Sequence, residues 1–296
     1  MDGTTHAQRA WVPWTVLAIG VVTASVSAIL IRYADGASGL ALSFWRCAAG
    51  AILLAPFATR ALRKMEPRDY VIPAVAGVCL AAHFATWITS VNLTTIASSV
   101  LLVSTTPIFV ALVERWIFHE RMPLAAWVGI VVAFVGTALI AGLDFEGSSL
   151  EGNALALAGA ITVAGYAIGG QRARQKLGIL EYAVVTYGFA AIALLPVCLL
   201  AGAELSGYPD RTWWAIVGLI VGPQLMGHTL INMALSDIDA TTVSVAVMGE
   251  PVIAITLAYV LFSEAPSALA YPGGLAILAG IYVVSVVRRQ PAVIVE

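Results

Sequence analysis

The sequence predicts an all-α membrane protein with ten transmembrane helices, arranged as two five-helix repeats of opposite topology. Composition is the first observation, because 60% of the residues are apolar and only 11% are charged. Ordinary soluble domains carry about 25% charged residues. The second observation is an internal repeat, and the third is an uneven distribution of basic residues between the two sides of the predicted helices.

Ten apolar stretches are each long enough to cross a bilayer. A helix needs roughly 20 apolar residues to span about 30 Å of hydrocarbon, and 12–31 is such a stretch without an ionisable group. The links are short, so no soluble domain is expected. We expect spans at 12–31, 40–59, 71–91, 96–114, 123–143, 152–170, 181–202, 212–235, 240–262 and 269–287.

Four residues recur without a gap 144 positions later. They are Pro107, Glu120, Gly129 and Gly136, which match Pro251, Glu264, Gly273 and Gly280. The first set lies in and after spans four and five, and the second lies five spans later. An odd number of spans per repeat gives the copies opposite orientations, as in many secondary transporters. We therefore expect repeats at 12–144 and 152–288, a duplication that only stabilises a bundle being the alternative.

The basic residues predict the orientation of the chain. Of the 15 lysines and arginines, 12 fall in the termini and even-numbered loops, and only Arg32 and Arg211 fall on the opposite side. Lysine and arginine near span ends favour the cytoplasm, so both termini are expected to be cytoplasmic. The remaining one, Arg46, lies within the second span.

Short motifs accompany the repeated prolines and glycines. They occupy residues 106–109 and 119–121 in the first half, and 250–252 and 262–264 in the second. Together they resemble the paired signature of EamA-type transporters in the drug/metabolite transporter superfamily. Phe44-Trp45-Arg46 is similar to that family's arginine near the start of the second span. The resemblance covers nearly the whole chain.

The resemblance implies a function and a location. It implies a central cavity lined by spans one, three, four, six, eight and nine, in a bacterial cytoplasmic membrane. It also implies export of small organic metabolites by alternating access, with aromatic and other neutral amino acids as the expected substrates. Other drugs or metabolites of the superfamily are the alternative.

The expected partners are few. They are an amino-acid substrate and the lipid bilayer, and protons are a candidate coupling partner. No nucleic acid and no cofactor are expected. No metal is expected either, because Cys47, Cys79 and Cys198 stand singly, without metal-ligand spacing.

Polar and aromatic side chains within the lining spans are candidate substrate-binding residues. Span eight carries Gln224, His228 and Asn232 at i, i+4 and i+8, along one helical face. Such a stripe should face protein or water and not lipid. The full set is His83, Trp87, Ser104, Tyr166, Gln224, His228, Asn232, Ser244 and Met248. Hydrogen bonding between helices is the alternative explanation.

Two charges and two prolines complete the candidates. Burial of Arg46 and Glu250 is costly, so each should be paired or lie in a hydrated cavity. Glu250 is a candidate for gating, proton coupling or amino-group recognition, and Arg46 for a carboxylate, with a fixed ion pair as the alternative. Pro107 and Pro251 remove a backbone hydrogen bond and are candidate hinges, with a static kink as the alternative.

Other functional classes fit the sequence less well. A phosphorylated substrate would need clustered arginine or lysine, and the spans contain only Arg46. A membrane-embedded enzyme would have to use His83, His228 and Glu250 as acids and bases. No recognised nucleophile or metal motif accompanies them, so an enzyme is not expected. A channel is the third possibility, and exchange kinetics would separate it from a carrier.

Overall fold

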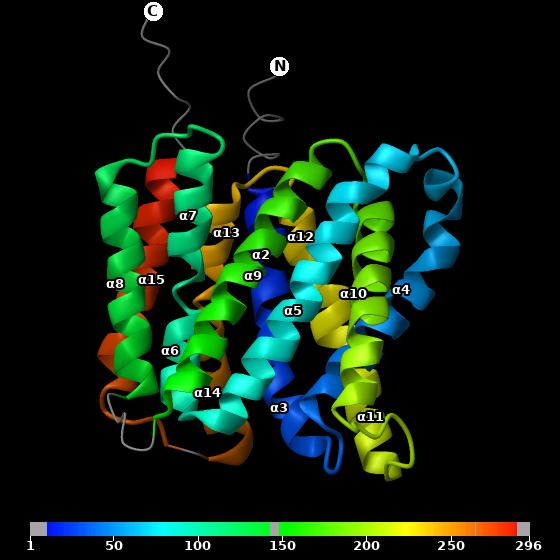
Figure 1. Cartoon of the computed structure of the whole chain (residues 1–296). Coiled ribbons are helices and arrows are strands. Elements are labelled where there is room, and N and C mark those ends of the chain that lie inside the picture. The colour runs from blue at the N-terminus through cyan, green and yellow to red at the C-terminus, as the bar shows by residue number, and fades with distance from the viewer. Residues whose placement is uncertain (1–10, 143–147, 264, 289–296) are drawn as a thin grey trace, which may run out of the picture.

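The computed structural model describes residues 11–142, 148–263 and 265–288. Within them, helices form ten segments long and apolar enough to cross a membrane, which confirms the predicted spans. The first span begins and the last span ends at the same side of the molecule (Figure 1). We call this side the terminal face and the opposite side the far face.

Six spans consist of one α-helix, apart from a short 3₁₀ turn at the start of span three. That turn is η1 (Pro67–Tyr70). The helices are α4 (Gly39–Leu62), α5 (Val71–Leu93), α8 (Leu124–Ala141), α9 (Leu150–Arg174), α10 (Ile179–Leu200) and α15 (Ala270–Arg288).

The other four spans are divided. Span one consists of α2 (Val12–Ser25) and α3 (Ser27–Tyr33). Span eight contains α11 (Asp210–Leu219), the π-helix η2 (Ile220–His228) and α12 (Thr229–Ala234). Spans four and nine are divided into α6 (Ile96–Val103) and α7 (Thr106–Trp116), and into α13 (Ala240–Val247) and α14 (Glu250–Phe262).

The breaks in spans four and nine lie just before the repeated prolines. Pro107 and Pro251 are each the second residue of the helix that follows the break. A proline has no N–H to donate and fits the first turn of a helix, where that donor has no partner anyway. Both spans are therefore interrupted at equivalent positions, and movement about these points stays a prediction.

The helix packing follows a two-fold relation between the halves. Spans two and seven, four and nine, and five and ten pack against each other, and each of these pairs consists of repeat counterparts. The contact between spans three and six has its counterpart in the contact between spans eight and one. Two bundles that were merely adjacent would not reproduce all five pairings.

The crossing of α8 and α15 shows the relation at the level of residues. A Cβ atom on Gly136 would lie 2.5 Å from the Gly273 carbonyl oxygen, and one on Gly273 would lie 2.7 Å from that of Gly136. Gly129 and Gly280 approach each other in the same way. The repeat maps the contact of Gly136 with Gly273 onto the contact of Gly280 with Gly129, as a two-fold relation between the halves requires. The helices are antiparallel, so the axis lies in the membrane plane, and the inverted repeat is confirmed.

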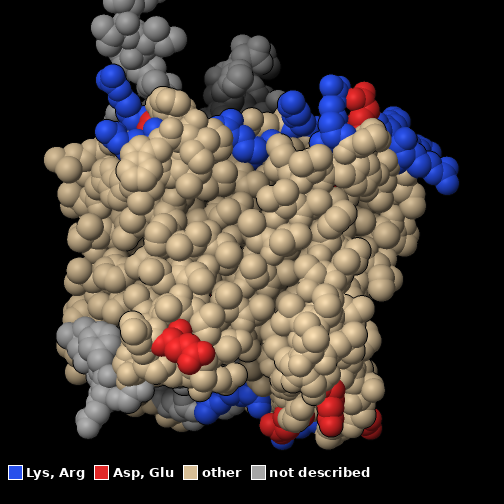
Figure 2. All heavy atoms as spheres, viewed as in Figure 1, with Lys and Arg blue, Asp and Glu red and all other residues tan. Residues whose placement is uncertain are grey.

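The surface separates into charged faces and an apolar middle. Lysine and arginine side chains gather at the terminal face, where Arg60, Arg63, Lys64 and Arg115 are exposed (Figure 2). Between the faces the outward side chains are mostly apolar, including Ile52 and Leu275. A belt of this kind matches the hydrocarbon of a bilayer.

The glycine crossing can be tested with neighbouring substitutions on α15. Gly273→Ala puts a methyl group against the Gly136 backbone, and overpacking of this kind costs about 1–3 kcal/mol. Gly274→Ala is the matched control, because its Cβ would meet the nearest atom of Val252 at 3.7 Å. Thermal unfolding in detergent should show a lower melting temperature for Gly273→Ala only. Equal melting temperatures would contradict the crossing.

Candidate functional site

Aromatic side chains from both halves meet at the seam between them. The rings of His83 and Trp87 on α5 are stacked, with centroids 5.9 Å apart and planes 3° apart. The ring centroid of Phe84 lies 5.5 Å from that of His83 and 6.2 Å from that of His228 in η2. The ring centroid of Tyr166 on α9 lies 6.3 Å from that of His228. We call these five residues the central cluster, which contains four of the predicted substrate-binding residues.

Hydrogen bonds orient two members of the central cluster. His83 Nδ1 lies 3.0 Å from the Gly159 carbonyl oxygen. A carbonyl only accepts, so Nδ1 carries the hydrogen and leaves Nε2 for the site. The Asn232 amide donates to the Tyr166 hydroxyl at 2.5 Å. The predicted Asn232 therefore acts here as a support that joins spans six and eight.

Span eight carries its polar residues on a π-helix followed by an α-helix. Residues eight apart in a regular α-helix drift by about 80° around the axis, because each residue turns about 100°. The structure departs from this expected geometry, since the carbonyl of Gln224 accepts from the Thr229 N–H in the wider i→i+5 pattern. The wider π turns reduce the rotation between Gln224 and Asn232 around the helix axis. Both Gln224 and Asn232 are fully buried.

Arg46 is buried in the same region without a complete set of partners. Its side chain is 6% exposed, and the guanidinium carbon lies 5.3 Å from the centre of the Phe84 ring. Its Nε and Nη2 atoms have no hydrogen-bond partner among the described residues, and neither do the two amide atoms of Gln224. Glu250 is half-buried and acts on Arg46 electrostatically. None of the ion pairs among the described residues joins Arg46 to Glu250, so the two are not a close ion pair in this conformation.

Three predicted site residues lie apart from the central cluster. The Ser104 hydroxyl donates to the Val100 carbonyl at 2.8 Å, and the Ser244 hydroxyl donates to that of Thr241 at 2.8 Å. Both are thus tied to their own helices. Met248 packs with apolar residues of spans four, five and ten. Binding of substrate by these three residues stays a prediction.

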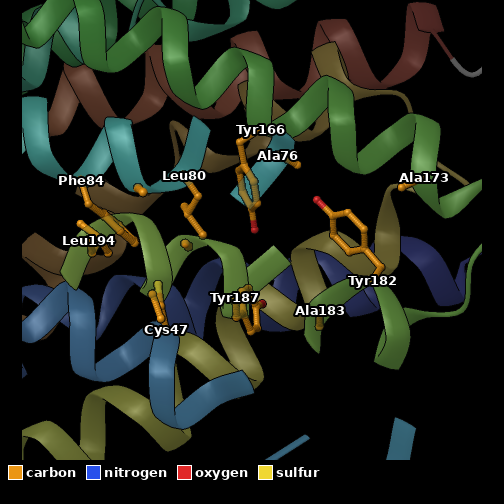
Figure 3. Close-up of a cluster of buried hydrophobic side chains, with 13 residues drawn as sticks. Cys47, Ala76, Leu80, Phe84, Tyr166, Ala173, Tyr182, Ala183, Tyr187 and Leu194 are labelled. Carbon is orange, nitrogen blue, oxygen red and sulfur yellow. The ribbon is translucent and has the colours of Figure 1, made fainter. Parts of the chain in front are cut away.

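Two aromatic residues that the sequence pattern did not indicate, Phe84 and Tyr187, also lie in this region. Both belong to a buried cluster between α4, α5, α9 and α10, in which Tyr166 projects toward Tyr187 (Figure 3). The Tyr187 hydroxyl is 3.1 Å from the Thr229 hydroxyl, so it links spans seven and eight. The sequence of an apolar span does not distinguish an aromatic side chain that faces lipid from one that faces protein. The position of Phe84 next to His83 was the one available signal.

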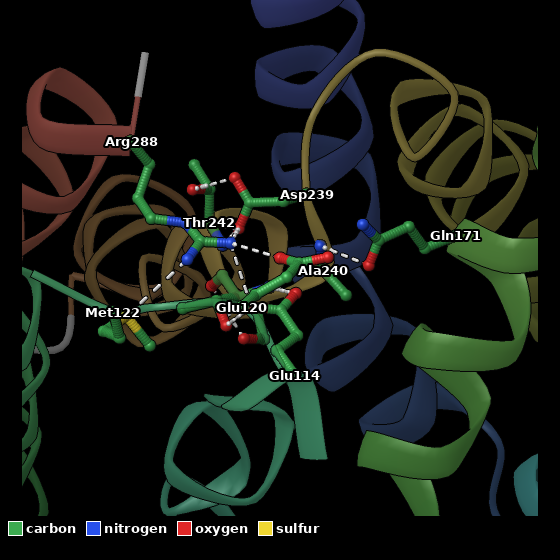
Figure 4. A network of polar contacts seen from close by, with 10 residues as sticks. Glu114, Glu120, Met122, Gln171, Asp239, Ala240, Thr242 and Arg288 are labelled. Atoms are coloured by element: carbon green, nitrogen blue, oxygen red, sulfur yellow. Dashed lines mark hydrogen bonds and ion pairs between the residues drawn. The ribbon is translucent and has the colours of Figure 1, made fainter. Parts of the chain in front are cut away.

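A second polar group, also missed, closes the terminal face. Arg288 Nη2 lies 2.9 Å from Glu114, 3.0 Å from Asp239 and 3.6 Å from Glu120 (Figure 4). The Thr241 hydroxyl donates to Glu114 at 2.7 Å. We call these five residues the terminal-face network. It joins α7, α13 and α15, so it holds the terminal-face halves of spans four and nine together. Glu264, the repeat counterpart of Glu120, lies outside the described residues.

Two pockets lie away from the central cluster. One of about 200 Å³ lies beside the terminal-face network and is lined in part by Trp14, Asp239 and Arg288. Another of about 460 Å³ lies between α8, α14 and α15 and is mostly apolar. Neither is lined by the central cluster.

Comparison with known protein families shows to which family the chain belongs. The model of the EamA-like transporter family matches residues 12–142 and matches again at residues 150–286. The chain belongs to the EamA-like transporter family. The two matches fall on the two halves that the inverted packing defines.

Relatives and a solved structure agree with this family. The chain is 24% identical to the uncharacterized transporter YdfC of Bacillus subtilis (strain 168), over 61% of the chain and 60% of YdfC. It is 24% identical to an uncharacterized transporter of Archaeoglobus fulgidus, over 84% of the chain and 88% of that protein. A crystal structure with 17% identity aligns with a TM-score of 0.79 over 93% of the chain and 96% of its own. The last likeness concerns the fold alone.

The terminal-face network can be tested by removing its arginine. Arg288→Met leaves Glu114, whose side chain is 2% exposed, without its countercharge. Breaking a buried pair in this way costs about 3–5 kcal/mol. Arg115→Met is the control, since Arg115 is exposed on the same face. Unfolding in detergent should occur several degrees lower for Arg288→Met and unchanged for Arg115→Met. The same melting temperature for both variants would remove the network from the stability of this conformation.

Proposed function

We propose that this EamA-like transporter exports small organic metabolites across the bacterial cytoplasmic membrane by alternating access, with aromatic and other neutral amino acids as its substrates. One observation carries the proposal. The central cluster lies at the seam of two inverted halves, where a change in their relative orientation would expose it to each side in turn.

The chemistry of the centre supports an amino acid over a phosphorylated compound. Aromatic rings surround the position, and Arg46 lies over one of them. Glu250 in turn interacts electrostatically with Arg46. One positive and one negative charge suit a zwitterion with an apolar side chain. A phosphate would need several basic groups. We also propose, on general sequence similarity and not on a diagnostic motif, that the chain is close in function to the amino-acid exporter YddG.

The divided spans supply a route for the conformational change. Pro107 and Pro251 lie at symmetric breaks, and the terminal-face network holds α7 against α13 on one side of them. We propose that release of this network, with bending at both prolines, opens the terminal face. Because the halves are related by a two-fold axis, an equivalent rearrangement would close the far face.

The charge distribution supports an orientation with both termini in the cytoplasm. Basic side chains gather at the terminal face, where Arg60, Arg63, Lys64 and Arg68 are exposed (Figure 2). Such an excess is typical of cytoplasmic loops. Export would then begin at the terminal face and end at the far face.

Counterflow in liposomes tests the transport proposal. Vesicles loaded with unlabelled phenylalanine should accumulate labelled phenylalanine transiently, and the initial rate should saturate with external concentration. A carrier exchanges substrates in this way, whereas flux through a pore rises in proportion to concentration. Protein-free liposomes are the control, and threonine and a cationic drug complete the set. Exchange of the drug without any amino acid would reject the proposed substrate class.

Cysteine labelling tests the orientation. The three native cysteines, Cys47, Cys79 and Cys198, are first replaced by alanine, and Arg63→Cys and Ser206→Cys are then made separately. Both sites are exposed, on the terminal and far faces respectively. In spheroplasts a membrane-impermeant maleimide should label Ser206→Cys, and it should label Arg63→Cys only after permeabilisation. The opposite pattern would invert the assigned topology.

A further inference from the structure

Arg46 presents hydrogen-bond donors that no described protein group uses. The N–H groups of a guanidinium point outward in its own plane. The Arg46 guanidinium carbon lies over the Phe84 ring, 5.3 Å from the ring centre. Its Nε and Nη2 are buried and unpartnered. These two neighbouring donors form the edge that binds a carboxylate with two parallel hydrogen bonds.

The breaks in spans four and nine are equivalent in position but differ in chemistry. A proline leaves the carbonyl four residues earlier without its helical partner. In span four this is the Val103 carbonyl, and the Thr106 hydroxyl donates to it at 2.7 Å. In span nine the carbonyl belongs to Val247, and the position of Thr106 is taken by Glu250. A carboxylate has no hydrogen to donate, so the Val247 carbonyl lacks an equivalent cap.

The second break therefore places two acceptors close together in the sequence. They are the carboxylate of Glu250 and the carbonyl of Val247, both at the interruption between α13 and α14. An ammonium group has three hydrogens to donate and carries the charge that Glu250 needs. Arg46 acts on Glu250 electrostatically, while its Nε and Nη2 have no hydrogen-bond partner among the described residues. The unpaired charges are thus of opposite sign and belong to opposite halves of the protein.

We propose that the central site binds the zwitterionic end of an α-amino acid. The Arg46 guanidinium binds the substrate carboxylate through Nε and Nη2. Glu250 and the Val247 carbonyl bind the substrate ammonium. The side chain of the amino acid then lies against the aromatic rings of the central cluster. This inference rests on the proposed function and assigns each end of the substrate to one half of the chain.

The site would also account for coupling between binding and conformation. The two ends of one small molecule would connect span two of the first half with span nine of the second. A substrate that lacks either end would leave one buried charge uncompensated, which is costly within a membrane protein. Only a complete zwitterion would therefore stabilise an arrangement in which both halves contact the substrate.

Three ligands distinguish the role of Arg46 from the role of Glu250. Phenylalanine carries both groups, phenethylamine lacks the carboxylate, and 3-phenylpropionate lacks the ammonium. Their dissociation constants are measured by competition with labelled phenylalanine, or by direct calorimetry, on purified wild type, Arg46→Gln and Glu250→Gln. Arg211→Gln is the matched control, because Arg211 lies exposed at the far face. Melting temperatures of all variants identify any loss of folding.

The expected result is a loss that depends on both the variant and the ligand. Arg46→Gln should weaken phenylalanine binding by about tenfold or more, the cost of about one charged hydrogen-bonded contact, and leave phenethylamine unchanged. Glu250→Gln should weaken phenylalanine and phenethylamine alike and leave 3-phenylpropionate unchanged.

Two outcomes overturn the inference, and they differ in what else they reject. In the first outcome, the wild-type protein exchanges phenylalanine, but each variant loses all three ligands equally or loses none of them. That result rejects the assignment of the two charges and keeps the proposed function. Wild type that binds none of the three ligands and exchanges no amino acid rejects both. The unchanged ligand within each variant shows that the site is still folded.

Discussion

The close approach of α8 and α15 is the contact on which the two-fold arrangement depends. Gly136 and Gly273 bring the backbones so near that a side chain at either position would meet a carbonyl oxygen. Lipid offers little hydrophobic driving force between helices, so close packing of small residues holds membrane helices together. Because the repeat maps this contact onto that of Gly280 with Gly129, the crossing lies on the axis that relates the halves. Every other pairing of spans follows from that axis.

Local properties of the sequence were sufficient to predict the fold. The length of an apolar stretch decides whether it can span a bilayer, and the recurring prolines and glycines revealed the duplication. The site was harder to predict. Glu114, Asp239 and Arg288 meet at the terminal face although the first and last are 174 positions apart. No local pattern links them. The π turns of η2 and the inward direction of Phe84 likewise depend on neighbours that only the folded chain supplies.

Repetition of a backbone break does not require repetition of its chemistry. Both breaks follow from a proline, so the duplicated chain bends at equivalent points. The residue before that proline differs, and Thr106 hydrogen-bonds to the local carbonyl while Glu250 leaves its counterpart uncapped. A symmetric fold thus carries an asymmetric site. Such asymmetry suits a substrate whose two ends have opposite charge, because identical halves would present identical groups.

Two arginines in the spans illustrate how partners determine what a buried charge does. Arg288 is surrounded by Glu114, Glu120 and Asp239, and its donors are used within the protein. Removing it would leave acids uncompensated, so its contribution is to the stability of one conformation. Arg46 lies over an aromatic ring and has hydrogen-bond donors that no described group uses. A buried cation in that state gains from any anion that reaches it. The cost of burying Arg46 is therefore offset most fully when a carboxylate is bound, which ties the energy of the site to its occupancy.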